Sequence, residues 1–243
     1  MTQKVLFNYI LVRIGLRKVL PAEIVNRKEV RENKEGLATT QCDNIIYANE
    51  KNNFARKGMV RRLVTAAELV QKKQGLKLLV YELYRSPEKQ AGLRERDRKE
   101  LLEAHPEYTE SQLEAALNRI SAKVGGSGHQ TGGAVDLTLC DENGHQLKMG
   151  TLYLEHNAKT VTDCPDISEE QHRNRQILLD AMQKAGFINY PGEWWHFCYG
   201  DRMWAAYARK PYAIYGEVTP EIINLFLSAC GLDREGPGQN DPQ

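Results

Sequence analysis

The feature that most constrains the fold is a predicted β-hairpin in the middle of the chain. Residues 133–139 read GAVDLTL, an apolar stretch as long as a buried strand, and residues 141–149 read DENGHQLKM. The dipeptide Asn143-Gly144 between them is a strong hairpin signal, because both residues tolerate the positive φ of tight turns. The sequence therefore predicts an antiparallel sheet, to which the apolar stretches 75–83 and 194–200 add strands.

Helix-start signals surround these strands. Ser86 is followed by a proline, which is favoured at the first helical position. Thr109 and Ser168 are each followed three residues later by glutamine, the pattern of a capping box. The predicted fold class is α+β, a small antiparallel sheet with helices packed around it. The predicted helices cover residues 86–105, 109–120, 168–186 and 219–231.

The length of 243 residues fits one main domain with extensions. We expect this domain to span residues 30–215. Residues 1–29 are expected to form an N-terminal extension that is helical. Residues 216–243 are expected to hold a C-terminal helix and a disordered tail.

Composition excludes several classes of protein. The 33 basic and 32 acidic residues leave a net charge of +1, which argues against a nucleic-acid partner. The apolar run from Val5 to Val12 is closed by Arg13 with no cleavage pattern after it, so we expect no signal peptide. No stretch reaches the roughly 20 apolar residues of a membrane span. Five scattered cysteines without a CxxC pair favour reduced thiols and the cytoplasm, with the periplasm as the alternative.

Four polar residues form a candidate catalytic group. His129, Asp136 and His196 could supply the three ligands that a catalytic zinc ion usually takes from the protein, and Glu193 could serve as the general base. Small residues between His129 and Asp136 would let the backbone pass close to the ion. The helical HExxH signature is absent, and each residue alone also fits an ordinary structural role. Spacing by itself leaves metal binding and structural roles equally open.

Longer motifs favour the metal. The stretch SGHQTGGAVD fits the pattern S-x-H-x-x-G-x-A-x-D, and EWWH fits E-x-W-H. Together they resemble the zinc D-Ala-D-Ala dipeptidase and carboxypeptidase family of the VanX and VanY type, the doubled tryptophan resembling the VanX type. NIIYANEKNNF, YELYRSPEKQ and MGTLY resemble further segments of that family. The resemblance runs from about Val30 to about Trp204, within what would then be a zinc peptidase domain.

The resemblance implies a role for each matching residue. His129, Asp136 and His196 correspond to the ligands of one zinc ion per chain, and Glu193 corresponds to the catalytic base. Arg85 corresponds to the arginine that stabilises the transition state. The expected substrate-binding residues are Ser127, Tyr47 and Glu155.

One position departs from the family pattern. Leu154 stands where VanX-type enzymes carry the acid that holds the free ammonium of the dipeptide, and Glu155 comes next. Adjacent side chains of a strand point to opposite faces, so Glu155 would need a bulge to turn inward. Without that acid, longer peptides become plausible substrates. The stretch YELYRSPEKQ also departs from the Y-R-P motif of that family, because Ser86 separates Arg85 from the proline.

Three functions are consistent with these observations. The first is zinc-dependent hydrolysis of free D-Ala-D-Ala, in cell-wall precursor metabolism or vancomycin-type resistance. The second is a D,D-carboxypeptidase that trims peptidoglycan stems, which Leu154 favours and EWWH opposes. The third is a zinc-binding module without turnover, which Glu193 and Arg85 oppose because a binder needs neither. The expected partner is a small peptide, and the oligomeric state is open.

Overall fold

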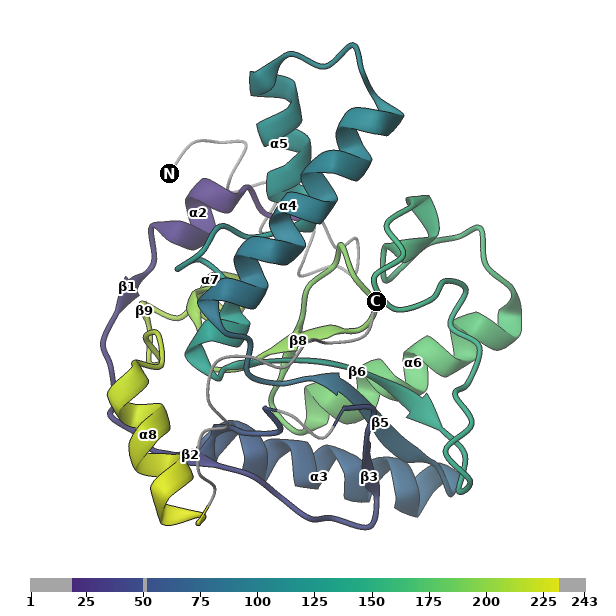
Figure 1. Cartoon of the computed structure of the whole chain (residues 1–243). Helices are drawn as coiled ribbons and strands as arrows, with labels where there is room; N and C mark the ends of the chain where they lie inside the picture. Colours follow the sequence, from purple (N-terminus) through teal and green to yellow (C-terminus); the bar gives the residue numbers. More distant parts are fainter. Residues whose placement is uncertain (1–18, 50–51, 232–243) are drawn as a thin grey trace.

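The computed structural model describes residues 19–49 and 52–231 and is built around one five-stranded sheet (Figure 1). The strand order is β3-β5-β6-β8-β7. The β3–β5 pair is parallel, and the other three pairs are antiparallel. The predicted α+β class is confirmed, with a sheet that is antiparallel except at this one edge. The strands are β3 (Ile45–Tyr47), β5 (Lys77–Glu82), β6 (Ala134–Cys140), β7 (Ile188–Asn189) and β8 (His196–Cys198).

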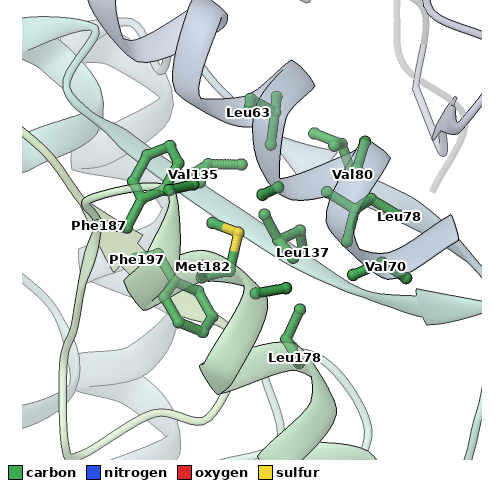
Figure 2. Packing of buried hydrophobic residues seen from close by; sticks show 14 of the residues in the cluster. Leu63, Val70, Leu78, Val80, Val135, Leu137, Leu178, Met182, Phe187 and Phe197 are labelled. Atoms are coloured by element: carbon green, nitrogen blue, oxygen red, sulfur yellow. The ribbon is translucent and has the colours of Figure 1, made fainter. Parts of the chain in front are cut away.

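One face of the sheet is covered by α3 (Lys57–Gln74) and α6 (Glu169–Lys184), which also pack against each other. Alternate residues of β5 and β6 point to this face, as the two-residue period of a strand requires. Figure 2 shows their aliphatic side chains meeting those of the two helices. The core therefore lies between the sheet and this helical layer. The side chains labelled there are Leu63, Val70, Leu78, Val80, Val135, Leu137, Leu178, Met182, Phe187 and Phe197.

A helical hairpin rises on the other side of the sheet (Figure 1). It consists of α4 (Pro87–Ala104) and α5 (Glu110–Ile120), which contact each other along their length. Two shorter helices are α7 (Arg202–Tyr207) and α2 (Ala22–Asn26), and these pack together. The face of the sheet opposite the main core is therefore left to polar side chains and to these helices.

Short strand pairs connect the outer segments. β1 (Glu29–Val30) pairs in parallel with β9 (Tyr212–Ala213), and β2 (Leu37–Ala38) pairs antiparallel with β4 (Ala55–Arg56). The C-terminal α8 (Pro220–Ala229) packs next to β2. Residues 1–18 of the expected helical extension lie outside the residues that the structure describes, and α2 lies in residues 19–29. The expected disordered tail falls almost wholly on residues 232–243, which the structure does not describe either. None of the described helices is long and apolar enough to cross a membrane.

The helix-start signals are confirmed. Ser86 accepts a hydrogen bond from the Lys89 backbone at the start of α4. Reciprocal capping boxes open α5 at Thr109 and α6 at Ser168. No prediction covered α3, whose preceding residue offers no capping side chain.

The predicted hairpin is only half right. After β6 the chain turns back through residues 141–145, but its return forms a single bridge, Cys140 to Gln146, in place of a strand. The reason lies in the sheet, because β5 occupies one edge of β6 and β8 pairs with residues 134–136 on the other. Only the end of β6 is left free for the returning segment.

Candidate metal centre and active site

A row of three polar side chains crosses the sheet on the face opposite the main core. Asp136 of β6 is paired with His196 of β8 on one side and with Glu82 of β5 on the other. Directly opposed residues of antiparallel strands point to the same face. A register shift between Val80 and Glu82 makes this possible, since regular pairing would place Tyr81 opposite Asp136. The β-bulge thus turns Glu82 out of the core and toward the site.

His129 joins the row from the 3₁₀ turn Gly128–Thr131 that precedes β6. Its Nδ1 lies 2.7 Å from the carbonyl oxygen of Leu83, so Nδ1 carries the proton and donates it. Its Nε2 lies 3.3 Å from Asp136 Oδ2 and has no hydrogen-bond partner among the described residues. When this nitrogen is protonated the ring carries a positive charge next to the carboxylate, and when it is not, its lone pair is available to a metal ion. A buried imidazole oriented in this way is typical of a metal ligand.

The glycines after His129 serve packing against protein backbone. Gly132 has a φ of +67°, which closes the 3₁₀ turn. A Cβ on Gly133 would lie 2.7 Å from the carbonyl oxygen of Tyr199 on the neighbouring segment. These small residues therefore let the 3₁₀ turn and β6 approach the segment that follows β8.

The three expected ligands meet. Asp136 Oδ1 lies 2.8 Å from Nδ1 of His196, and the ligand atoms of His129, Asp136 and His196 all lie within 4.8 Å of one another. Burial alone would raise the pKa of Asp136, but the charges and hydrogen bonds of the two histidines outweigh it and hold the pKa well below its ordinary value. Two imidazoles and one carboxylate, with one nitrogen unpaired, fit a catalytic zinc site.

Arg85 lies beside this group. Its guanidinium is buried and donates from Nε and Nη2 to Glu82 Oε2 at 2.9 and 2.5 Å. Nη1 donates to Gln90 Oε1 at 2.9 Å, and Nη2 lies 3.4 Å from Asp136 Oδ2. Burial alone would raise the pKa of Glu82, but the positive charges of His129 and Arg85 hold it below its ordinary value. Glu82 and Gln90 thus position Arg85 against the group of His129, Asp136 and His196.

Tyr153 also reaches the row. Its hydroxyl lies 3.1 Å from Asp136 Oδ2 and 3.3 Å from Glu82 Oε2, and its ring stacks on Tyr81 at 4.2 Å. The loop that carries Tyr153 is held by the buried Arg175 of α6, which donates to four backbone carbonyls between residues 149 and 162. Burial raises the pKa of Tyr153 well above its ordinary value, so its hydroxyl is a donor to the two carboxylates.

Glu193 occupies the turn that leads into β8. Its backbone nitrogen donates to Tyr190, and His196 donates back to the Glu193 carbonyl, so the carboxyl group is carried by a closed turn. Burial raises the pKa of Glu193 to about 7, with the charge of Asp136 adding to the effect. A carboxyl group with a pKa near neutrality is suited to accept and return a proton. Trp194 and Trp195 next to it are buried core residues.

The three expected substrate-binding residues have different surroundings. Ser127 is buried two residues before His129, and its hydroxyl caps no backbone group of the following turn. Tyr47 lies on β3, two strands away from Asp136, and its hydroxyl donates to Thr40 at 3.3 Å. Glu155 is exposed and accepts from the Leu152 backbone at 2.8 Å. The structure therefore places Ser127 next to the ligands and joins neither of the others to them.

The strand expected around Leu154 is wrong. Leu154 lies in a turn with a φ of +61°, so the alternation argument for Glu155 does not apply. The Glu155 carboxylate also binds the Asn157 side chain at 2.7 Å, which keeps it within its own loop.

A model of the peptidase family described as D-ala-D-ala dipeptidase (Peptidase_M15) matches residues 30–214. The chain belongs to this family. A D-alanyl-D-alanine dipeptidase of Synechocystis is 40% identical over 88 residues, which cover 32% of this chain and 36% of the relative. One of Escherichia coli K12 is 33% identical over 123 residues, covering 51% of this chain and 55% of the relative. The matches to these two relatives thus span between a third and just over half of their length.

Among solved structures, the LdcB LD-carboxypeptidase, described in connection with peptidoglycan recognition, is 20% identical with a TM-score of 0.45. That comparison covers 86% of this chain and 82% of the other.

Sequence reasoning missed Glu82, Gln90 and Tyr153. A signal existed for Glu82, because an acid at the end of an apolar strand is rarely buried unless it is paired. Gln90 and Tyr153 had no such signal: one lies in a charged helix and the other in a loop of mixed composition.

Proposed function

We propose that the protein is a zinc-dependent D-alanyl-D-alanine dipeptidase. The observation that carries this proposal is the buried group of His129, Asp136 and His196, with an unpaired imidazole nitrogen and the carboxyl group of Glu193 beside it. Family membership and the names of the relatives supply the reaction and the substrate.

The chain's own residues support peptide-bond hydrolysis. A zinc ion held by His129, Asp136 and His196 would supply a Lewis acid at the scissile carbonyl. Glu193 takes a proton from the attacking water and returns it to the leaving amine, which a pKa of about 7 allows in both directions. The Arg85 guanidinium, held by Glu82, stabilises the negative charge that develops on the carbonyl oxygen.

A D,D-carboxypeptidase is the second candidate, favoured by one observation. Leu154 provides no charge for a free ammonium group, and the neighbouring Glu155 is exposed and engaged within its own loop. The assay that separates the candidates offers the zinc-loaded protein free D-Ala-D-Ala and the same dipeptide acetylated at its amino group. Glu193→Ala protein is the blank for both.

Turnover of the free dipeptide alone supports the dipeptidase. Turnover of the acetylated compound supports the carboxypeptidase, and zinc binding without turnover of either supports a binding module.

We propose residues 30–215 as the peptidase domain, which agrees with the family match and with the pairing of β1 with β9. We propose the cytoplasm as the compartment, with the periplasm as the alternative. The five free cysteines support a reducing environment.

A further inference from the structure

The helix α4 buries two residues, and both are polar. Gln90 and Asp97 are 1% and 3% exposed, and no apolar residue of α4 is buried. They are seven residues apart, so they lie on the same face of the helix, about 10 Å from each other along its axis. Gln90 marks the direction of this face, since it binds Arg85 in the site. The face of α4 that points toward the metal ligands thus carries a buried carboxylate.

Asp97 has unused hydrogen-bonding capacity. Its Oδ1 accepts two bonds from Arg96, at 3.2 and 2.7 Å, while its Oδ2 accepts none from the described residues. Arg96 is 41% exposed and lies 3.6 Å from Glu100 as well, so its charge is shared between two carboxylates. Burial of a carboxylate is costly unless its charge and its lone pairs are satisfied. A cationic ligand would satisfy them.

Asp97 lies on the face of α4 that Gln90 joins to Arg85, and its charge reaches the general base. Its negative charge acts on Glu193 and on His156, a half-buried histidine whose ring lies 6.0 Å from that of Trp195. Asp97 is therefore close enough to the general base and to the loop of His156 for its charge to act on both. Asp136 and Glu82 are engaged by the histidines and by Arg85, and Glu155 is engaged in its own loop.

We propose that Asp97 binds the free ammonium group of the substrate and makes the enzyme selective for dipeptides. This inference rests on the proposed function. In a free dipeptide the ammonium group is attached to the carbon next to the scissile carbonyl, so it lies close to Glu193 during the reaction. In a longer peptide the same nitrogen is an uncharged amide, which brings no positive charge to the buried carboxylate. Asp97 on α4 thereby supplies the acid that the loop at Leu154 does not.

The test compares Asp97→Asn with Glu100→Gln. Both variants remove one negative charge from α4, and Arg96 contacts both carboxylates, but Glu100 is 64% exposed. For Asp97→Asn we expect the KM for D-Ala-D-Ala to rise roughly ten- to a hundredfold, the range of a hydrogen bond between charged groups, with kcat changing much less. Glu100→Gln is expected to keep both constants within about twofold, since exposed charge pairs contribute little. Asp97→Asn should also cut the preference for the free over the acetylated dipeptide by a similar factor.

A binding measurement keeps this inference separate from the proposed function. Calorimetric titration of D-Ala-D-Ala into zinc-loaded Glu193→Gln protein, with and without Asp97→Asn, needs no turnover. Absence of turnover by wild-type protein would overturn the proposed function, while weaker binding caused by Asp97→Asn would still support the ammonium site. The ammonium site would be overturned by any of three results. These are equal binding with and without Asp97→Asn, no binding at all, or a KM effect no larger than that of Glu100→Gln. Melting temperatures show whether Asp97→Asn is folded; if it is not, Asp97→Ser is used in the same comparison.

Discussion

Replacing Glu82 by glutamine tests the claim that a β-bulge positions Arg85, the arginine proposed to stabilise the transition state. The Arg85 side chain is 10% exposed and donates twice to one oxygen of Glu82, at 2.9 and 2.5 Å. Glutamine keeps the shape of the side chain and one carbonyl acceptor, but it removes the charge. The variant therefore asks whether the ion pair, and not the packing, holds Arg85 in place.

The expected loss of stability is set by what remains around the guanidinium. Removing one partner of a buried ion pair costs about 3–5 kcal/mol. Asp136 still lies 3.4 Å from Arg85, and Gln90 still accepts from its Nη1. We therefore expect a loss of about 2–3 kcal/mol, which for a chain of this size lowers the melting temperature by roughly 4–12 °C. Loss of a well-placed donor to the developing charge lowers kcat by about 10²–10³.

The assay is thermal unfolding of the chelator-treated protein, followed by D-Ala-D-Ala turnover after zinc is restored. Lys89→Met is the matched control, because Lys89 lies 3.1 Å from the other oxygen of Glu82 but is 50% exposed. It is expected to change stability by less than about 1 kcal/mol. A Glu82→Gln protein with the melting temperature and kcat of the wild type, or an equal effect of Lys89→Met, would refute the reasoning.

Three more predictions follow from the site and its supporting loop. His196→Ala should abolish zinc retention in metal analysis, and unchanged zinc content in the variant would count against the ligand set. Zinc at 100 times its Kd should stabilise the wild type by about 2.7 kcal/mol. The pKa of Glu193 rises from 4.5 to about 7 on folding, so between these pH values the metal-free folded state binds one proton that the unfolded state does not. The free energy of unfolding therefore falls by at most about 3 kcal/mol as the pH rises from 4.5 to 7. Glu193→Gln should remove this loss in unfolding titrations at pH 5 and 7.5, and an identical pH profile for both proteins would contradict it. Arg175→Met removes a donor from four carbonyls, of which Val161 keeps the Cys164 backbone as a second donor. It should lower the free energy of unfolding in urea by about 3 kcal/mol or more, and an unfolding midpoint equal to that of the wild type would contradict this.

Local signals explain which parts of the fold could be predicted. The capping boxes at Thr109 and Ser168 involve residues three positions apart, so the sequence shows them directly. The prediction of a second hairpin strand was wrong because β8, a segment about fifty residues further along the chain, pairs with β6 at that edge. Competition between distant segments for one strand edge leaves no mark in either segment.

The sequence by itself determined the chemistry of the candidate metal site. His129, Asp136, His196 and Glu193 belong to contiguous motifs, and the structure brings the first three together. It also determined where α4, α5 and α6 begin, because a helix start depends on side chains within one turn.

Only the tertiary structure decided where each acid lies. The bulge in β5 turns Glu82 toward Asp136, and α4 buries Asp97 on the face that carries Gln90, while the turn at Leu154 leaves Glu155 exposed. The direction of each side chain follows from strand register and helix packing, and both depend on contacts between segments far apart in the chain. The identity of a residue states what it can do, and its long-range contacts decide whether it does so in the site.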